Sequence, residues 1–428
     1  MRASSLFIFS FLSLFPFAAF ADLYDSLADV YHSNPTLASE RENLKAVEMF
    51  IDMAYTGWQP NLGANANVGL SDGKIMDSKY SNKPREIGLS AAQNLFQGFK
   101  TDSEIKAAKY LVSAEKAQLY KTEQDIFMKS INAYIDVLNT REVLDLQKNN
   151  QDILQKHYDL YRDKQQVGIL TKTDVAQAEA RLERAKTDTI NAETNYKNAL
   201  EIYRNLYGYV ETKYTPINLK GTKELFPRNL DEAEIIAGKR HPSILLAEAL
   251  KKAADENITI SKSTLRPSLD IKASAVKGRD QSIYDEMRDV TVGLYLTVPL
   301  YDQGMANASS KQAKYAAASL KERIESAQRS VTEGLRKAWN ILEAKRAAIK
   351  SATTQVKANE LALNGVQDEQ ERGSRTVLDV LDAQQELLDA RVTLTRVKHE
   401  EISAYFSVIS SVGNLTADGL KITKIAQK

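Results

Sequence analysis

The chain has 428 residues, no cysteine, and a formal net charge of +1 from 57 basic and 56 acidic residues. The lack of cysteine excludes a disulfide framework, a thiolate metal site and a lipid anchor on an N-terminal cysteine. The balanced charge gives no reason to expect nucleic acid as a partner.

The first 21 residues have the pattern of a secretory signal peptide. Arg2 provides a positive start, an apolar run extends from Leu6 to Phe20, and Ala19-Phe20-Ala21 is a small-x-small cleavage sequence. The run is shorter than the ~20 residues that a spanning helix needs, so an N-terminal membrane anchor is the less favoured alternative. We therefore expect this segment to be removed after export.

The remainder of the chain repeats itself. Landmark residues recur in the same order at an offset of 205 to 207 residues, in these pairs: Pro35 and Pro242, Pro60 and Pro267, Gly98 and Gly304, Gly168 and Gly373, Asp174 and Asp379, and Gly208 and Gly413. Such a constant offset indicates a tandem duplication. The expected parts are a first repeat, a connector, a second repeat and a C-terminal tail, over residues 22–208, 209–239, 240–415 and 416–428.

Each repeat begins with a helix, which two candidate strands follow. The strands lie within residues 59–96 in the first repeat and within 266–301 in the second. The loops between them, near 72–84 and 279–288, are expected to be solvated turns, and a role as surface receptors is the less favoured alternative. Alternate residues of the last strand are apolar, namely Val290, Val292, Leu294, Leu296 and Val298. Segments of about ten residues suit a tilted membrane-spanning strand, although an ordinary soluble hairpin would give the same pattern.

Each pair of strands leads into a helical hairpin, over residues 100–207 and 305–412. The outgoing helices lack proline and contain little glycine, so we expect about 65 residues each and a length of about 100 Å. The hairpins are expected to turn at Gly168 and Gly373. The return helices alternate spacings of three and four, as coiled-coil seams do. In the second return helix this seam is predicted to include Leu378, Leu381, Gln385, Leu388 and Val392.

The number of strands has a consequence for assembly. Four strands cannot close a barrel alone, because single-chain barrels begin at eight, and an open sheet edge is unstable in lipid. Two protomers would give eight strands, a width filled by side chains, whereas three would give twelve and leave a lumen. The expected fold class is an α+β membrane protein, in which a trimeric 12-stranded β-barrel with four strands per protomer continues into an α-helical barrel.

Two aspartates follow the second hairpin turn, in the stretch RGSRTVLDVLDAQ that spans residues 372–384. Asp379 and Asp382 are three residues apart at the start of a helix, so they face the same way. Helix-start chemistry is the simpler explanation, because carboxylates favour the positive end of the helix dipole and Thr376 with Asp379 resembles a capping box. Alternatively, threefold repetition would make the pair an acidic ring across a pore mouth, and such rings select cations.

The duplicated hairpins, together with GLYLTVPLYDQG (293–304) and GSRTVLDVLDAQ (373–384), resemble the TolC family of outer-membrane channel proteins. The resemblance implies a homotrimer in the cell outer membrane, with its barrel in the outer-membrane lipid and its helical barrel projecting into the periplasm. It also implies a passive exit duct of a tripartite efflux pump or a type I secretion system. A periplasmic adaptor protein and an inner-membrane ABC or proton-driven transporter would open the duct at its periplasmic tip.

The resemblance further assigns roles to residues near the hairpin turns. Asp379 and Asp382 match the paired aspartates of the family's constricted periplasmic entrance. Some members have a tyrosine where this chain has a glutamine, and a glutamine there could still hydrogen-bond to an aspartate. The residues that the resemblance assigns to the closed-state latch are Arg375, Thr173, Asp174 and Gln370.

Two other classes of function are less favoured. A periplasmic adaptor-type coiled-coil protein also has long helical hairpins, but usually only one, flanked by two halves of a β-domain. An enzyme is not expected, because the four histidines lie far apart in the sequence and no P-loop, nucleophile elbow or HExxH motif is present. The sequence therefore predicts no catalytic residue, no cofactor and no bound metal.

Overall fold

The structure is a computed structural model, and it describes residues 22–75, 78–211, 213–280 and 285–422. The predicted signal peptide and the last six residues of the predicted tail lie outside these ranges. The chain divides into two compact units. One unit comprises residues 39–122 and 235–333, and the other comprises the segments before, between and after them.

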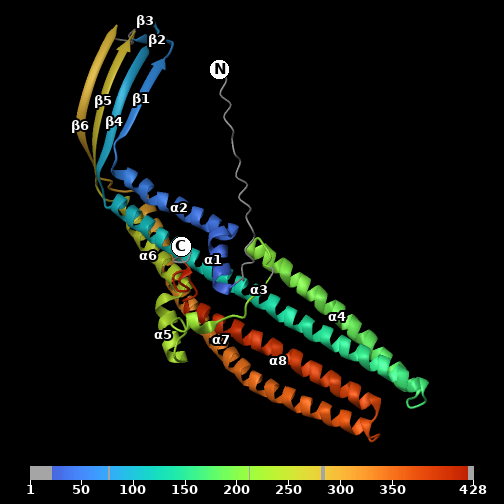
Figure 1. Ribbon diagram of the computed structural model, residues 1–428. Helices are drawn as coiled ribbons and strands as arrows, with labels where there is room; N and C mark the ends of the chain where they lie inside the picture. The colour runs from blue at the N-terminus through green and yellow to red at the C-terminus, as the bar shows by residue number, and fades with distance from the viewer. Residues whose placement is uncertain (1–21, 76–77, 212, 281–284, 423–428) are drawn as a thin grey trace, which may run out of the picture. The chain divides into compact units, whose positions relative to one another are not determined.

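The first of these units contains a four-stranded antiparallel sheet in the order β1-β4-β5-β6 (Figure 1). The strands are β1 (Asn61–Val68), β4 (Arg85–Gln97), β5 (Ser268–Arg279) and β6 (Glu286–Thr297). Because β4 belongs to the first repeat and β5 to the second, both repeats contribute to one sheet. Within the described residues, β1 and β6 each have one unpaired edge.

The segment between β1 and β4 differs from the expected solvated turn. Its residues form two short strands, β2 (Ser71–Ile75) and β3 (Ser78–Asn82), which pair as a separate two-stranded sheet. Gly73 lies opposite Tyr80, and a Cβ on this glycine would be 2.5 Å from the tyrosine hydroxyl. The tyrosine ring thus covers the glycine backbone, a cross-strand contact that stabilises such a pair of strands. The expected solvated turn over 72–84 thus contains a short regular hairpin that the sequence did not indicate.

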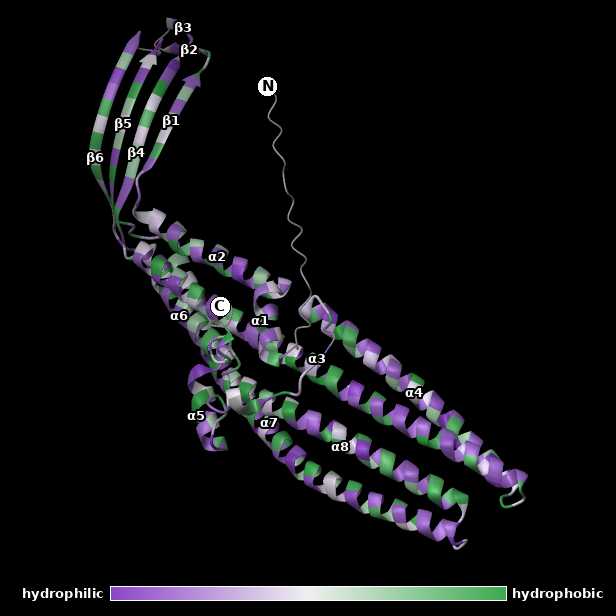
Figure 2. Ribbon diagram, viewed as in Figure 1, coloured by the Kyte–Doolittle hydropathy of each residue, from purple (hydrophilic) through white to green (hydrophobic). Residues whose placement is uncertain are grey.

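Side chains alternate between the two faces of the four-stranded sheet. Residues in register across it show this clearly, since Ala64 lies opposite Leu89, Leu89 opposite Ala275, and Ala275 opposite Val290. On this face the large apolar side chains are exposed in the single chain, including Leu62, Ile87, Leu89, Val290, Val292, Leu294 and Leu296. Figure 2 shows β6 beginning with hydrophilic residues and carrying hydrophobic bands further along. The predicted alternation along the last strand is confirmed.

A tight turn joins each repeat's last strand to its long helix. Gly98 has a φ of +60°, and a Cβ built on it would lie 2.4 Å from the Cβ of Arg266. The Arg266 guanidinium donates a hydrogen bond to the Gly98 carbonyl at 3.0 Å. Only glycine combines this conformation with so close an approach. Gly304 has the same left-handed conformation, with a φ of +86°, at the corresponding place in the second repeat.

The helices confirm the predicted hairpins. The outgoing helices α3 (Lys100–Gln166) and α7 (Met305–Glu371) have 67 residues each, and the return helices α4 (Lys172–Tyr207) and α8 (Val377–Val412) have 36 each. The remaining α-helices are α1 (Leu23–Ser33), α2 (Pro35–Tyr55), α5 (Leu230–Arg240) and α6 (Pro242–Ser263). Among the described residues, no helix combines the length and the apolarity that crossing a membrane would require.

Helix α8 packs on two sides. One cluster joins it to α3 and α4 and consists of Leu154, Tyr161, Ala178, Leu182, Ala185, Val377 and Leu381. A second cluster joins it to α7 and consists of Leu363, Val380 and Leu387. The predicted single seam is therefore wrong in part, because Leu378 is 37% exposed while Val377 and Val380 are each 2% exposed. A helix with two neighbours buries two stripes, and one heptad pattern describes only one of them.

The connector is held by a cluster of tyrosines. Tyr203 and Tyr207 of α4 stack with ring centroids 4.0 Å apart, and Tyr214 of the connector meets Tyr203 edge-on at 5.3 Å. Tyr134 of α3 joins the cluster and donates a hydrogen bond to the Thr215 carbonyl at 2.8 Å. These contacts fasten the connector to the first helical hairpin.

Candidate functional site

Both long helices end in the same motif. Gly168 has a φ of +80°, its N–H donates to the Gln165 carbonyl at 3.0 Å, and the Ile169 N–H donates to the Lys164 carbonyl at 2.9 Å. This pair of bonds is a Schellman motif, which ends a helix with a left-handed residue. The second hairpin repeats both bonds around Gly373, whose φ is also +80°. The two glycines thus lie at the hairpin turns, as predicted.

Both return helices begin with a capping box. In α8 the Thr376 hydroxyl accepts a hydrogen bond from the Asp379 N–H at 3.2 Å, and the Asp379 carboxylate accepts one from the Thr376 N–H at 2.8 Å. In α4, Thr171 and Asp174 form the same reciprocal pair at 3.2 and 2.9 Å. The predicted capping box at Thr376 is confirmed. Asp174 has the same structural role in the first repeat, so both aspartates fix a helix start.

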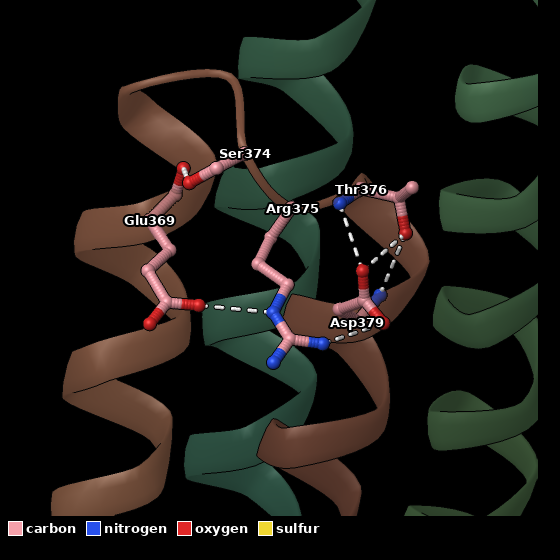
Figure 3. Close-up of polar contacts among 5 residues, drawn as sticks. All are labelled: Glu369, Ser374, Arg375, Thr376 and Asp379. Atoms are coloured by element: carbon pink, nitrogen blue, oxygen red, sulfur yellow. Dashed lines mark hydrogen bonds and ion pairs between the residues drawn. The ribbon is translucent and has the colours of Figure 1, made fainter.

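Arg375 lies in the turn between α7 and α8 (Figure 3). Its Nε donates to the Glu369 carboxylate at 2.9 Å, and its Nη1 lies 4.0 Å from an Asp379 carboxylate oxygen. The hydrogen bond that Arg375 donates to Glu369 raises the pKa of the Arg375 guanidinium. Hydrogen bonds from the Thr376 backbone and hydroxyl, with the nearby Arg375, hold the pKa of the Asp379 carboxyl below its usual value. One cation therefore joins carboxylates on both sides of the turn.

The residues assigned to the latch lie at both turns. In the described single chain, Arg375 bonds to Glu369 and Asp174 bonds to Thr171, so each has its partner within its own hairpin. Thr173 is exposed, and Gln370 is half-buried with its carbonyl engaged in the helix end. Among the described residues of the single chain, no bond joins Asp174 to Arg375.

The structure adds one residue that the sequence analysis missed. Arg181 of α4 donates a hydrogen bond from Nη2 to the carboxylate of Asp382 on α8. This ion pair joins the two helical hairpins and lies beside the apolar cluster formed by Ala178, Leu182 and Leu381. Arg181 and Asp382 lie in the first three turns of α4 and α8, and each helix begins just after a hairpin turn. Opposite charges at such matching positions are a sequence signal for an ion pair. The contact itself links residues 201 positions apart, which local patterns do not reveal.

The two aspartates of the predicted ring retain exposure. The side chain of Asp379 is 39% exposed and that of Asp382 is 52% exposed. Asp379 accepts two hydrogen bonds from Thr376 at Oδ2, and Asp382 accepts one from Arg181 at Oδ1. Among the described residues of one chain, no group of three or more histidine, aspartate or glutamate side chains could hold a metal ion.

The buried histidine belongs to the helical packing. His399 on α8 is 8% exposed, and its Nε2 lies 3.2 Å from the Glu142 carboxylate on α3. The hydrogen bond from His399 lowers the pKa of the Glu142 carboxyl. The Nδ1 atom has no partner among the described residues. His399 therefore has a polar partner at one ring nitrogen only.

The chain has two helical hairpins with capped, acidic turns, and a sheet with one apolar face and two open edges. This combination is typical of outer-membrane export channels. The chain belongs to the outer membrane efflux protein family, whose model matches residues 27–208 and 236–414. This membership places it in the cell outer membrane as an exit duct, and it bears out the resemblance to the TolC family.

Similar proteins support the assignment over nearly the whole chain. The outer membrane efflux protein BepC of Brucella suis is 28% identical over 410 residues, which cover 95% of this chain and 88% of BepC. The outer membrane protein TolC of Escherichia coli is 26% identical over 432 residues, covering 96% of this chain and 86% of TolC. The solved structure of CusC has the same fold, with a TM-score of 0.82, 16% identity, and coverage of 94% and 95%.

Proposed function

We propose that three copies of the chain form one continuous, passive conduit from the periplasm to the cell exterior. The observation that carries this proposal is the four-stranded sheet with one exposed apolar face and two unpaired edges. Backbone groups at such edges need partners in lipid, and neighbouring copies supply them when the sheets close into a ring. Three sheets give twelve strands and a lumen, while the long helices extend the wall into the periplasm.

The entrance of this conduit is formed by the hairpin turns. Asp379 and Asp382 from three protomers provide an acidic ring that attracts cations. The latch of the closed state consists of Arg375, Thr173, Asp174 and Gln370, which act between hairpins of neighbouring protomers. Within each protomer, the bond from Arg181 to Asp382 holds the second hairpin against the first. Opening requires the hairpins to separate, which exchanges these bonds for contacts with water or a partner.

The conduit does not supply energy, so its partners do. A periplasmic adaptor protein and an inner-membrane ABC or proton-driven transporter engage the hairpin turns and separate them. The duplicated organisation over residues 22–208 and 240–415 suits this role, because each repeat contributes one strand pair to the wall and one hairpin to the entrance. The connector over 209–239 fixes the first hairpin at its base.

Recordings in planar lipid bilayers test the proposal. The purified full-length protein is expected to insert as cation-selective channels of one conductance class. The double substitution Asp379→Asn with Asp382→Asn should weaken cation selectivity and block by divalent cations, because the ring loses its charge. The double substitution Glu183→Gln with Asp188→Asn, which removes one exposed and one half-buried carboxylate from α4, is the matched control.

The outcomes separate the two parts of the proposal. If the wild-type protein gives no channels, the conduit is rejected. If channels form but divalent block is the same in the ring variant, the control variant and the wild type, the conduit stands and the acidic ring is rejected.

A further inference from the structure

The apolar face of the four-stranded sheet ends in charged residues on one side only. Alternate residues of a strand share a face, so Arg85, at the start of β4, lies on the same face as Ile87 and Leu89. The corresponding ends of β5 and β6 are charged as well. We define the basic rim as Arg85, Lys277, Arg279 and Arg288, with Glu286 as its one carboxylate. All five are exposed. At the opposite end of this face, β5 and β6 carry the uncharged residues Leu269, Ile271, Leu294 and Leu296.

The charges of the basic rim are not balanced within the chain. Arg85 lies directly opposite Arg279, and like charges in this position destabilise a strand pair. Within the described residues, neither arginine forms a salt bridge or a side-chain hydrogen bond. The Glu286 carboxylate lies opposite Arg279 in register, but its nearest cations are Arg288 at 3.1 Å and Lys277 at 3.6 Å, so one carboxylate is shared by several cations.

A second carboxylate near the basic rim is also engaged. Asp280 accepts a hydrogen bond from the backbone N–H of Lys83 at 2.7 Å. The two arginines instead border a shallow hollow, which is lined by Asn67, Val68, Arg85, Glu86, Ile87, Lys277 and Arg279. A guanidinium pair at the edge of an apolar surface is a point where an external anion would offset the repulsion between the two cations.

The chemistry of the surroundings identifies this anion. Guanidinium groups bind phosphate through two parallel hydrogen bonds, and exposed basic groups beside a membrane attract anionic headgroups. The apolar face begins one residue pair away, at Ile87 and Val290, so a phosphate attached to acyl chains would contact both surfaces. A soluble anion would use only the basic rim. The combination favours a lipid.

The direction of the chain places the basic rim in the membrane. Helices α3 and α7 start just after the ends of β4 and β6, at the side of the sheet opposite the basic rim. With the helices in the periplasm, the basic rim lies at the outer leaflet, an orientation that rests on the proposed function. We propose that the basic rim binds the phosphate groups of phosphorylated glycolipids in the outer leaflet of the outer membrane.

The test measures lipid binding by the full-length protein in detergent, by native mass spectrometry. The probes are bisphosphorylated lipid A, the same glycolipid after dephosphorylation, and inorganic phosphate. Arg85→Gln with Arg279→Gln should weaken binding of the phosphorylated probe by about tenfold or more, since charge-assisted hydrogen bonds are lost. Lys272→Gln is the matched control, because Lys272 lies on the other face of β5, over the ring of Tyr295 at 5.2 Å.

The expected result is that the wild type and Lys272→Gln bind the phosphorylated lipid equally, and that all variants bind the dephosphorylated lipid equally weakly. Equal binding of the phosphorylated lipid by all three proteins would overturn the proposal. So would displacement of the lipid by inorganic phosphate at similar concentration, which would indicate a site for a free anion. Conductance in bilayers without phosphorylated lipid is recorded in parallel. If the proteins form normal channels and lipid binding is the same in all of them, only the lipid site at the basic rim is rejected. If the wild type forms no channels, the conduit itself is rejected.

Discussion

Asp379 and Asp382 are three residues apart on α8, yet their carboxylates have different partners. Asp379 closes a capping box with Thr376, whereas Asp382 bonds to Arg181 on the neighbouring hairpin. Loss of Asp379 would loosen the start of one helix, while loss of Asp382 would weaken the contact between two hairpins. In a ring built from both aspartates, one carboxylate therefore caps its own helix and the other contacts the neighbouring hairpin.

The Arg181–Asp382 pair gives a prediction at this scale. Arg181→Gln should raise the open probability of single channels, because the bond holds the hairpins together. Exposed ion pairs contribute about 0.2–1 kcal/mol, a factor of about 1.4 to 5 in the closed-to-open equilibrium. The measurement is single-channel recording in planar bilayers.

A suitable control for this prediction lies on the same helix. Arg184 pairs with Asp188 within α4 at 3.8 Å, so Arg184→Gln removes a charge without breaking a contact between hairpins. Asp382→Asn should change the open probability as Arg181→Gln does, and the double variant should add little. An equal shift in the Arg184 variant would show that general charge loss, not this bond, is responsible.

At the scale of elements, the sequence predicts what local patterns determine. Long segments without proline gave the 67-residue helices, and glycines marked the turns at Gly168 and Gly373. The strands β2 and β3 were missed, because their pairing depends on the packing of Tyr80 over Gly73. The second buried stripe of α8 was missed because it faces a neighbour that the heptad pattern cannot specify.

The candidate site was predictable to the same extent. The capping box at Thr376 follows from four consecutive residues, and it was found. The partner of Asp382 is contributed by the other repeat, so only the folded chain brings Arg181 to it. The roles of the latch residues between protomers stay predictions, since they depend on the assembly.

The tyrosine cluster predicts a dependence of stability on pH. Burial raises the pKa of Tyr214 to about 12, and burial also raises the pKa of Tyr207 well above its ordinary value. Below pH 10 these phenols are neutral in both the folded and the unfolded chain, so their contribution is fully present. As the pH rises above 10, the unfolded chain ionises first, and stability falls until the folded-state pKa is reached.

The measurement is the free energy of unfolding of the full-length protein between pH 8 and pH 11.5. Tyr207→Phe removes one ionising group, so the loss of stability above pH 10 should be less steep by about 1.4 kcal/mol per pH unit. Tyr315→Phe is the control, because Tyr315 is 76% exposed. An unchanged slope in the Tyr207 variant would contradict the assignment of this pH dependence to the cluster.

At the scale of the whole molecule, the open edges of the sheet should be closed by other copies. Since the chain has no cysteine, engineered pairs report contacts without interference. Ala64→Cys on β1, combined in turn with cysteines at positions 290–294 of β6, should give at least one pair that oxidises between chains. Disulfides need Cα atoms about 4.4–6.8 Å apart, so only adjacent strands react. The expected product on a denaturing gel is a covalent ladder that ends at the trimer.

A pair inside the sheet provides the reference. Leu89 lies opposite Ala275 in register, so Leu89→Cys with Ala275→Cys should oxidise within one chain and give no ladder. If every edge pair stays monomeric while the internal pair oxidises, the shared wall is wrong. A ladder that ends at the dimer would contradict the threefold assembly.

The helix lengths match between the repeats, at 67 and 36 residues, and this restricts which insertions and deletions the gene can tolerate. One inserted residue in α7 would advance everything beyond it by 1.5 Å and rotate it by about 100°. The contact between Arg181 and Asp382 would then be out of register, and each long helix could change length only together with its return helix and with the other repeat. In homologous sequences, insertions and deletions should therefore be concentrated in the connections between strands. Those within one helix should be accompanied by matching changes in its return helix and in the other repeat.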